Sequence, residues 1–242
     1  QIVSALLVFI FHMKLNVEMD KGVKYLKPQG AILKEMYSIG LPAIISQALL
    51  TVMTYGLNII LGQMREVGEN AVTVYGLYCK IQQLIIFAAV GMRDAITPIV
   101  SFHYGMQDKR RVKEGIRYGM LYTLVLMVLG LVIIEVCAEP LATFFSLSDL
   151  TYGMCVECMR IVSLAFLFAG LCIAFRGVFQ AIECGLESLL ISLGRQVVFI
   201  LPVAWVLSCR VTGVENVGQV WWTFLAGEGL TLICAFLMYR RK

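Results

Sequence analysis

Ionisable side chains interrupt long apolar stretches of this chain, where charge is costly unless it finds a partner or water. They are Lys80, Arg93, Asp94, Arg176, Arg195 and Glu228. At membrane depth such groups usually face the inside of a helical bundle and often mark a pathway for ions or substrate. Glu228 is the most informative, because apolar residues flank it on both sides. Its carboxyl group either takes up and releases protons or pairs with a buried arginine or lysine to hold helices in register, and the sequence leaves both alternatives open.

Uncharged polar side chains add to this set within the same stretches: Gln47, Asn58, Gln82, Gln83, Gln180 and Gln196. Lys80 and Gln83 are three positions apart, so on a helix they share a face. The spacing therefore predicts a polar stripe on the second apolar stretch. Arg93 and Asp94 are adjacent and point in different directions, so we interpret both as structural.

Six apolar stretches must position these residues: 37–63, 71–103, 118–137, 155–180, 188–209 and 217–239. A spanning helix needs about 20 mostly apolar residues, and hydrophobic residues make up 60% of the chain. The predicted fold class is all-α, a polytopic transmembrane bundle of six helices. Pro98 and Pro202 predict bends in the second and fifth stretches, and Pro140 is expected to help end the third.

The N-terminal part divides into two segments that precede the bundle of residues 37–242. Residues 1–13 are apolar but too short to span, so we interpret them as the end of a preceding transmembrane helix, with an interfacial segment as the alternative. Residues 14–36 read as a polar linker. The chain begins with Gln1, and we expect it to be the second half of a longer protein.

Basic residues are concentrated in alternate loops. Five lie in 14–34, five in 109–117 and three in 240–242, whereas the opposite loops hold only Arg65 and Arg210. Cytoplasmic loops carry the excess of Lys and Arg. The pattern predicts a multi-pass protein of the plasma (inner) membrane with a cytoplasmic C-terminus.

Several function classes are not supported by the sequence. Cys155 and Cys158 have a metal-like spacing, but no second pair follows and both histidines are distant. No signature of a metalloprotease, serine hydrolase or nucleotide-binding enzyme is present. The net charge of +4 is explained by the loops facing anionic lipid. We therefore expect no enzyme activity, metal, cofactor or nucleic-acid partner.

Six segments in a fixed order resemble the C-terminal lobe of multidrug and toxic compound extrusion (MATE) transporters. They are IGLPAIISQALLTVMTYGLNIILG (39–62), AITPIVSFHYGMQDKRRVKEGIRYG (95–119), EPLATFFS (139–146), MRIVSLAFLFAGLCIAFRGVFQAI (159–182), SLLISLGRQVVFILPVAWVL (188–207) and VWWTFLAGEGLTLICAF (220–236). Each segment is a weak signal alone, and the resemblance covers essentially all of 37–242.

The resemblance implies an antiporter of twelve helices in two six-helix lobes that alternate between inward-open and outward-open states. This chain would supply helices seven to twelve, and its partner would be the N-terminal lobe of the same polypeptide. Family members export cationic, often aromatic, organic compounds in exchange for Na⁺ or H⁺. For this chain we expect substrate contacts at Gln47, Tyr55, Lys80 and Gln83, with Glu228 as the candidate for ion coupling.

The sequence departs from sodium-coupled members, which place acidic residues on the first and fourth helices of this lobe. The first stretch contains no Asp or Glu, and the fourth has only Glu157 near its outer end. In other members the coupling carboxylate lies in the N-terminal lobe, and on that pattern Glu228 would assist. The alternatives are a flippase for lipid-linked saccharides, which the few mid-membrane cations disfavour, a non-transporting membrane scaffold or receptor and, last, an intramembrane enzyme.

Overall fold

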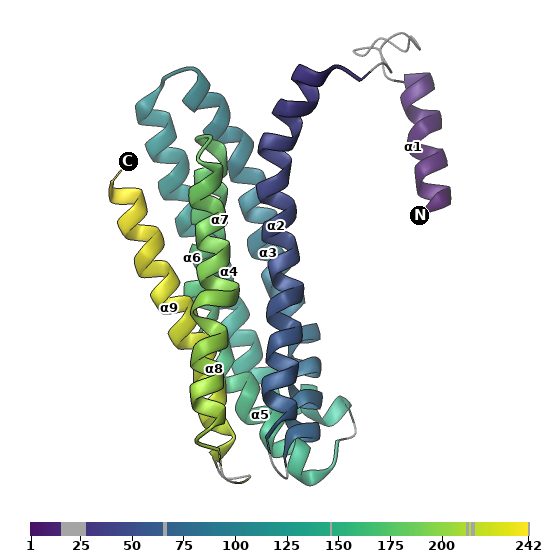
Figure 1. Cartoon of the computed structure of the whole chain (residues 1–242), viewed down its shortest axis with the longest axis vertical. Coiled ribbons are helices and arrows are strands. Elements are labelled where there is room, and N and C mark those ends of the chain that lie inside the picture. Colours follow the sequence, from purple (N-terminus) through teal and green to yellow (C-terminus); the bar gives the residue numbers. More distant parts are fainter. Residues whose placement is uncertain (16–27, 65–66, 146, 212, 214–215, 242) are drawn as a thin grey trace. The chain divides into compact units, whose positions relative to one another are not determined.

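The computed structural model describes residues 1–15, 28–64, 67–145, 147–211, 213 and 216–241, and most of them are helical (Figure 1). The helices are α1 (Ile2–Leu15), α2 (Gly30–Gly62), α3 (Gly68–Gly105), α4 (Lys109–Phe144), α5 (Asp149–Ser163), α6 (Phe166–Ala181), α7 (Gly185–Leu193), α8 (Ile200–Ser208) and α9 (Gly218–Arg240). A π-helical turn, η2 (Gly194–Val198), lies between α7 and α8. The predicted all-α class is confirmed.

The chain divides into two compact units, residues 1–41 and 42–242. The first unit holds α1, which has no buried residue, and the first turns of α2. Helix α2 begins at Gly30 and so takes in the last residues of the segment interpreted as a linker. The second unit holds the rest of α2 and all of α3–α9, and every feature described below lies in it.

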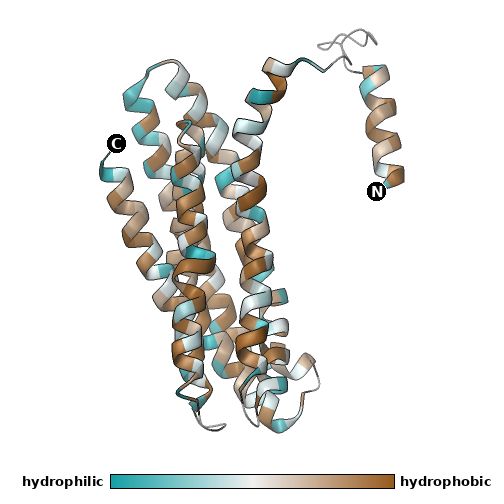
Figure 2. Ribbon diagram, in the orientation of Figure 1, coloured by the Kyte–Doolittle hydropathy of each residue, from teal (hydrophilic) through white to brown (hydrophobic). Residues whose placement is uncertain are grey.

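Five helices in the described residues are long and apolar enough to cross a membrane: α2, α3, α4, α9 and the continuous run Gly185–Ser208. The count rises to 6 if α5 and α6, which meet at a 48° bend, form one broken span. These segments correspond to the six predicted stretches. Figure 2 shows hydrophobic residues along most of the length of these helices.

Two details of the helices differ from the sequence predictions. Pro140 does not end its helix, since α4 continues to Phe144. Proline removes only one backbone hydrogen bond, and packing continues beyond it because Ala138 and Ala142 are both buried. The fourth stretch is broken at residues 164–165 between α5 and α6, where the sequence has neither proline nor glycine.

Glycines on α4 let it approach α3 closely. A Cβ atom at Gly119 would overlap the side chain of Ile96, and one at Gly130 would overlap Ile85. Small residues at helix contacts are the usual means of tight packing in lipid, where no hydrophobic effect drives helices together. The outward faces are apolar instead, as Leu84 (75% exposed) and Val136 (73% exposed) illustrate.

Replacing Gly130 with alanine should therefore lower stability. Alanine is ordinarily the better helix former by about 1 kcal/mol, but overpacking against the stiff Ile85 side chain costs about 1–3 kcal/mol. Gly76→Ala is the matched control, because no atom lies within 4 Å of a Cβ placed there. Thermal unfolding of the complete protein in detergent should give a lower Tm for Gly130→Ala than for Gly76→Ala. Equal values would contradict this view of the α3–α4 contact.

Candidate functional site

A cavity of about 430 Å³ opens among α2, α3, α6, the η2–α8 segment and α9. Much of its wall is apolar or aromatic and includes Phe87 and Phe224. Its polar wall includes four amides, three guanidinium groups and one carboxylate, from Gln47, Gln82, Gln83, Gln196, Arg93, Arg176, Arg195 and Glu228. An apolar pocket of this size with a few convergent polar groups is typical of a site for small organic molecules.

A buried ion pair joins two elements across this cavity. The Nε atom of Arg195 donates a hydrogen bond to Oε1 of Glu228 at 2.6 Å. The two side chains are only 15% and 6% exposed. The second carboxylate oxygen, Oε2, is buried and has no hydrogen-bond partner in the described part of the chain. Pairing with a buried arginine is what the structural interpretation of Glu228 requires, and the pair also supplies a carboxylate that could bind a proton.

The backbone around Arg195 departs from a regular α-helix. In η2 the amide of Phe199 donates to the carbonyl of Gly194 at 3.1 Å, five residues earlier. This wider turn ends shortly before Pro202, which cannot donate to the carbonyl of Val198. π-Helical turns are rare and are found frequently at functional sites. Here the turn carries Arg195 and Gln196, and both line the cavity.

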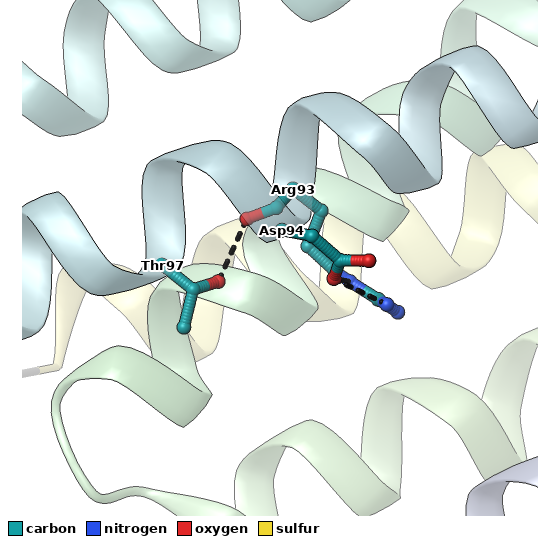
Figure 3. A network of polar contacts seen from close by, with 3 residues as sticks. All are labelled: Arg93, Asp94 and Thr97. Atoms are coloured by element: carbon teal, nitrogen blue, oxygen red, sulfur yellow. Dashed lines mark hydrogen bonds and ion pairs between the residues drawn. The ribbon is translucent and has the colours of Figure 1, made fainter. Parts of the chain in front are cut away.

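Arg93 lines the cavity but is neutralised by its neighbour on α3 (Figure 3). Its Nε and Nη2 atoms donate to Oδ1 of Asp94 at 2.8 and 2.6 Å. Thr97 donates to the carbonyl of Arg93 at 2.8 Å. The expectation that Arg93 and Asp94 simply point apart is wrong, because the long arginine side chain folds back to reach the adjacent carboxylate. Gly177 on α6 leaves room for it, since a Cβ there would overlap Arg93.

Arg176 carries the third guanidinium, and its contacts differ from those of the other two. It projects from α6 into the cavity wall, and its Nε atom is buried without a hydrogen-bond partner among the described residues. None of the ion pairs among the described residues includes Arg176.

The residues proposed from the sequence fall into two groups. Gln47, Gln83 and Glu228 line one cavity, although they come from α2, α3 and α9. Tyr55 (69% exposed) and Lys80 (exposed) are not among the lining residues. Sequence reasoning noticed Arg176 and Arg195 as intramembrane cations but assigned neither of them to the site. Their position inside long apolar stretches was the available signal, and only the fold shows that they share a cavity with Glu228.

Breaking the Arg195–Glu228 pair from one side should be strongly destabilising. Glu228→Leu leaves a mostly buried guanidinium without its carboxylate, which costs about 3–5 kcal/mol. Replacing both partners (Arg195→Met with Glu228→Leu) should recover most of that loss. As a control, Arg110→Gln with Glu114→Gln removes an exposed pair and should change stability by about 0–1 kcal/mol. The unfolding free energy is measured in detergent micelles for the complete protein, for each single variant and for the double variant. If the change in the double variant equals the sum of the two single changes, the two residues are not coupled.

Comparison with known proteins finds relatives over nearly the whole chain. The MatE family model matches residues 42–206. The chain is 24% identical over 237 residues to a multidrug export protein, MepA, of Staphylococcus saprophyticus, covering 98% of this chain and 51% of the relative. It is 23% identical to the MepA protein of Staphylococcus haemolyticus, covering 97% of this chain and 49% of the relative. The chain thus spans about half the length of the curated relatives it matches.

Solved structures agree on the fold. An outward-facing multidrug resistance MATE family transporter of the MOP superfamily superposes with a TM-score of 0.88 at 22% identity, covering 99% of this chain and 53% of that one. A MOP superfamily transporter from Pyrococcus furiosus, for which a reversed polarity of the binding pocket is reported, superposes with a TM-score of 0.87 at 21% identity and the same coverage. With the family model matching most of the chain, these findings confirm the resemblance seen in the sequence: the chain belongs to the MatE family, a family of multi-pass membrane transporters and not of enzymes.

Proposed function

We propose that this chain forms one lobe of an ion-coupled exporter of amphipathic, drug-like organic compounds. The observation that carries the proposal is the cavity of about 430 Å³, in which apolar, amide and ionised side chains converge inside a MatE bundle. The relatives named for multidrug export support this substrate class. They do not favour the saccharide flippase, although three arginines line the cavity.

The cavity supplies two kinds of substrate contact. Phe87 and Phe224 offer aromatic surface to an apolar ring system, and Gln47 and Gln83 offer amide groups for orientation. Such mixed walls bind compounds of varied shape, because apolar contact is non-directional. Tyr55 and Lys80 lie outside this cavity, so we propose that they contact substrate only where a second lobe closes over α2 and α3.

Coupling follows from the Arg195–Glu228 pair. A proton on Glu228, or a cation that draws the carboxylate away, weakens its attraction to Arg195. Helix α9 and the η2 turn are then free to adopt a different arrangement. A bound ion shifts a conformational equilibrium only through such a difference in its interactions with the two states. We propose that making and breaking this pair biases the lobe between inward-open and outward-open states, with H⁺ or Na⁺ as the coupling ion.

Efflux of a fluorescent amphipathic dye tests the proposal in cells that express the complete reading frame. Export should stop when one of the two gradients, H⁺ or Na⁺, is collapsed and continue when the other is collapsed. The gradient that is required identifies the coupling ion. Glu228→Gln keeps the size of the side chain but removes its charge, so gradient-driven export should fall about tenfold or more. Glu114→Gln, on the exposed first turns of α4, is the matched control and should export normally.

The two arms of this experiment separate different failures. Unchanged export by a well-expressed Glu228→Gln protein would remove Glu228 from the coupling mechanism. Absence of export for several dyes, despite good expression, would contradict the exporter itself.

The orientation of the lobe gives an independent prediction. The helix N-termini and turns near Gln107 and Glu183 lie at the same end of successive spans as the C-terminus, and the basic residues concentrate there. Reporter fusions at Gln107 and after Lys242 should therefore be active only as cytoplasmic reporters, whereas a fusion at Gly213 should report the outer side. The opposite pattern would reverse the assigned topology.

A further inference from the structure

The first turns of α4 carry more positive charge than the structure neutralises. Residues 108–117 include five basic and two acidic side chains. Arg110 pairs with Glu114 at 3.0 Å, and Arg111 pairs with Asp108 at 3.5 Å. The remaining cations, which take part in no ion pair among the described residues, are Lys109, Lys113 and Arg117. Three positive charges are therefore left to attract an anion.

These three side chains follow one side of the helix. They are spaced at intervals of four residues, which places side chains one above another on a helix surface. All three are exposed. The helix end itself is already capped, because the carboxylate of Asp108 accepts a hydrogen bond from the amide of Arg111 at 3.1 Å. The attraction for an anion therefore comes from the side chains.

An apolar surface continues from this point along the outside of α4. No charged residue occurs between Arg117 and Glu135. The helix supplies no residue to the cavity wall described above. The exposed aliphatic residues of this stretch recur every three or four positions and include Leu121, Val125, Val128 and Val132. Because lipid tails are as apolar as leucine, such a surface suits an acyl chain.

Two tyrosines mark the level at which the charged part meets the apolar part. The rings of Tyr118 and Tyr122 are stacked, with centroids 6.4 Å apart, and both side chains are exposed. Tyrosine is enriched at the level of the lipid headgroups, where one end of the side chain is apolar and the other is wet. Arg117 directly precedes this pair, so we expect its guanidinium near the headgroups. Lys113 and Lys109 follow about 6 and 12 Å further from the hydrocarbon.

We propose that this side of α4 binds an anionic phospholipid of the bilayer, with the phosphate group on Arg117 and Lys113 and one acyl chain along the exposed aliphatic residues. A guanidinium fits a phosphate through two parallel hydrogen bonds, and a lysine adds a point charge. Lys109 adds attraction for a headgroup that carries net negative charge. The binding depends neither on the transported compound nor on which leaflet this end of α4 faces.

Thermal unfolding of the purified complete protein in detergent, at increasing lipid concentration, tests this binding. Dioleoyl phosphatidylglycerol should raise the Tm in a saturable way, because a ligand that binds only the folded state stabilises it. Dioleoyl phosphatidylcholine, which has the same chains and no net charge, should raise the Tm much less. Glycerol 1-phosphate, which has the phosphate without the chains, should have no effect at the same concentrations.

Two double variants locate the headgroup on α4. Lys113→Gln with Arg117→Gln should weaken phosphatidylglycerol binding about 25-fold, which is about fivefold for each cation. Arg110→Gln with Glu114→Gln is the matched control, because it removes one paired charge of each sign from the same turns. This control should leave the affinity within about twofold of the unmutated protein.

Removal of the same amount of positive charge from another helix separates a site from diffuse attraction. Arg240→Gln with Arg241→Gln changes the C-terminal end of α9, and it should weaken binding less than about threefold, because charges without direct contact are screened by salt. An equal loss in this variant and in Lys113→Gln with Arg117→Gln would show that lipid is attracted to the basic end as a whole. That result overturns the site on α4.

The choice among the three compounds decides the chemistry of the ligand. Equal stabilisation by phosphatidylglycerol and phosphatidylcholine overturns the recognition of charge, and equal stabilisation by glycerol 1-phosphate assigns the cations to a soluble anion instead of a lipid. No response to any compound also overturns the proposal, as expected where another part of the polypeptide covers this side of α4. If Lys113→Gln with Arg117→Gln fails to fold, the preference of the unmutated protein still decides the question.

Discussion

A charge inside hydrocarbon is costly unless it finds a partner or faces a cavity, and this constraint bears on how the elements of the second unit face one another. Arg93, Arg176, Arg195 and Glu228 come from α3, α6, η2 and α9, yet all four line one cavity. Turning α9 by one residue would present a glycine to Arg195 and move Glu228 away from it, because both neighbours of Glu228 are glycine. The ion pair therefore sets the rotation of α9, while the outward faces remain apolar and suited to lipid.

Irregular backbone serves the same arrangement. The π-helical turn η2 carries Arg195 and Gln196, and both line the cavity. The 48° bend between α5 and α6 similarly gives α6 a direction different from that of α5, and Gly177 then lets α6 come close to Arg93. Bends and close contacts are thus the means by which the polar residues converge.

The sequence predicts the positions of the spanning helices better than it predicts their irregularities. Span lengths and apolar composition locate the spanning helices, because the bilayer sets both. Helix irregularities depend on tertiary packing: α4 continues through Pro140 because alanines on either side stay buried, and the break at residues 164–165 has no local signal.

Part of the candidate site could also be predicted from the sequence. Polar residues in apolar stretches are found by inspection, and Gln47, Gln83 and Glu228 do line the cavity. Lys80 was placed on the face of Gln83 by spacing, but the cavity side of α3 runs through Cys79, Gln82, Gln83 and Ile86, and Lys80 is turned about 100° from Cys79. Which arginine pairs with Glu228 and which stays unmatched depends on contacts between distant helices.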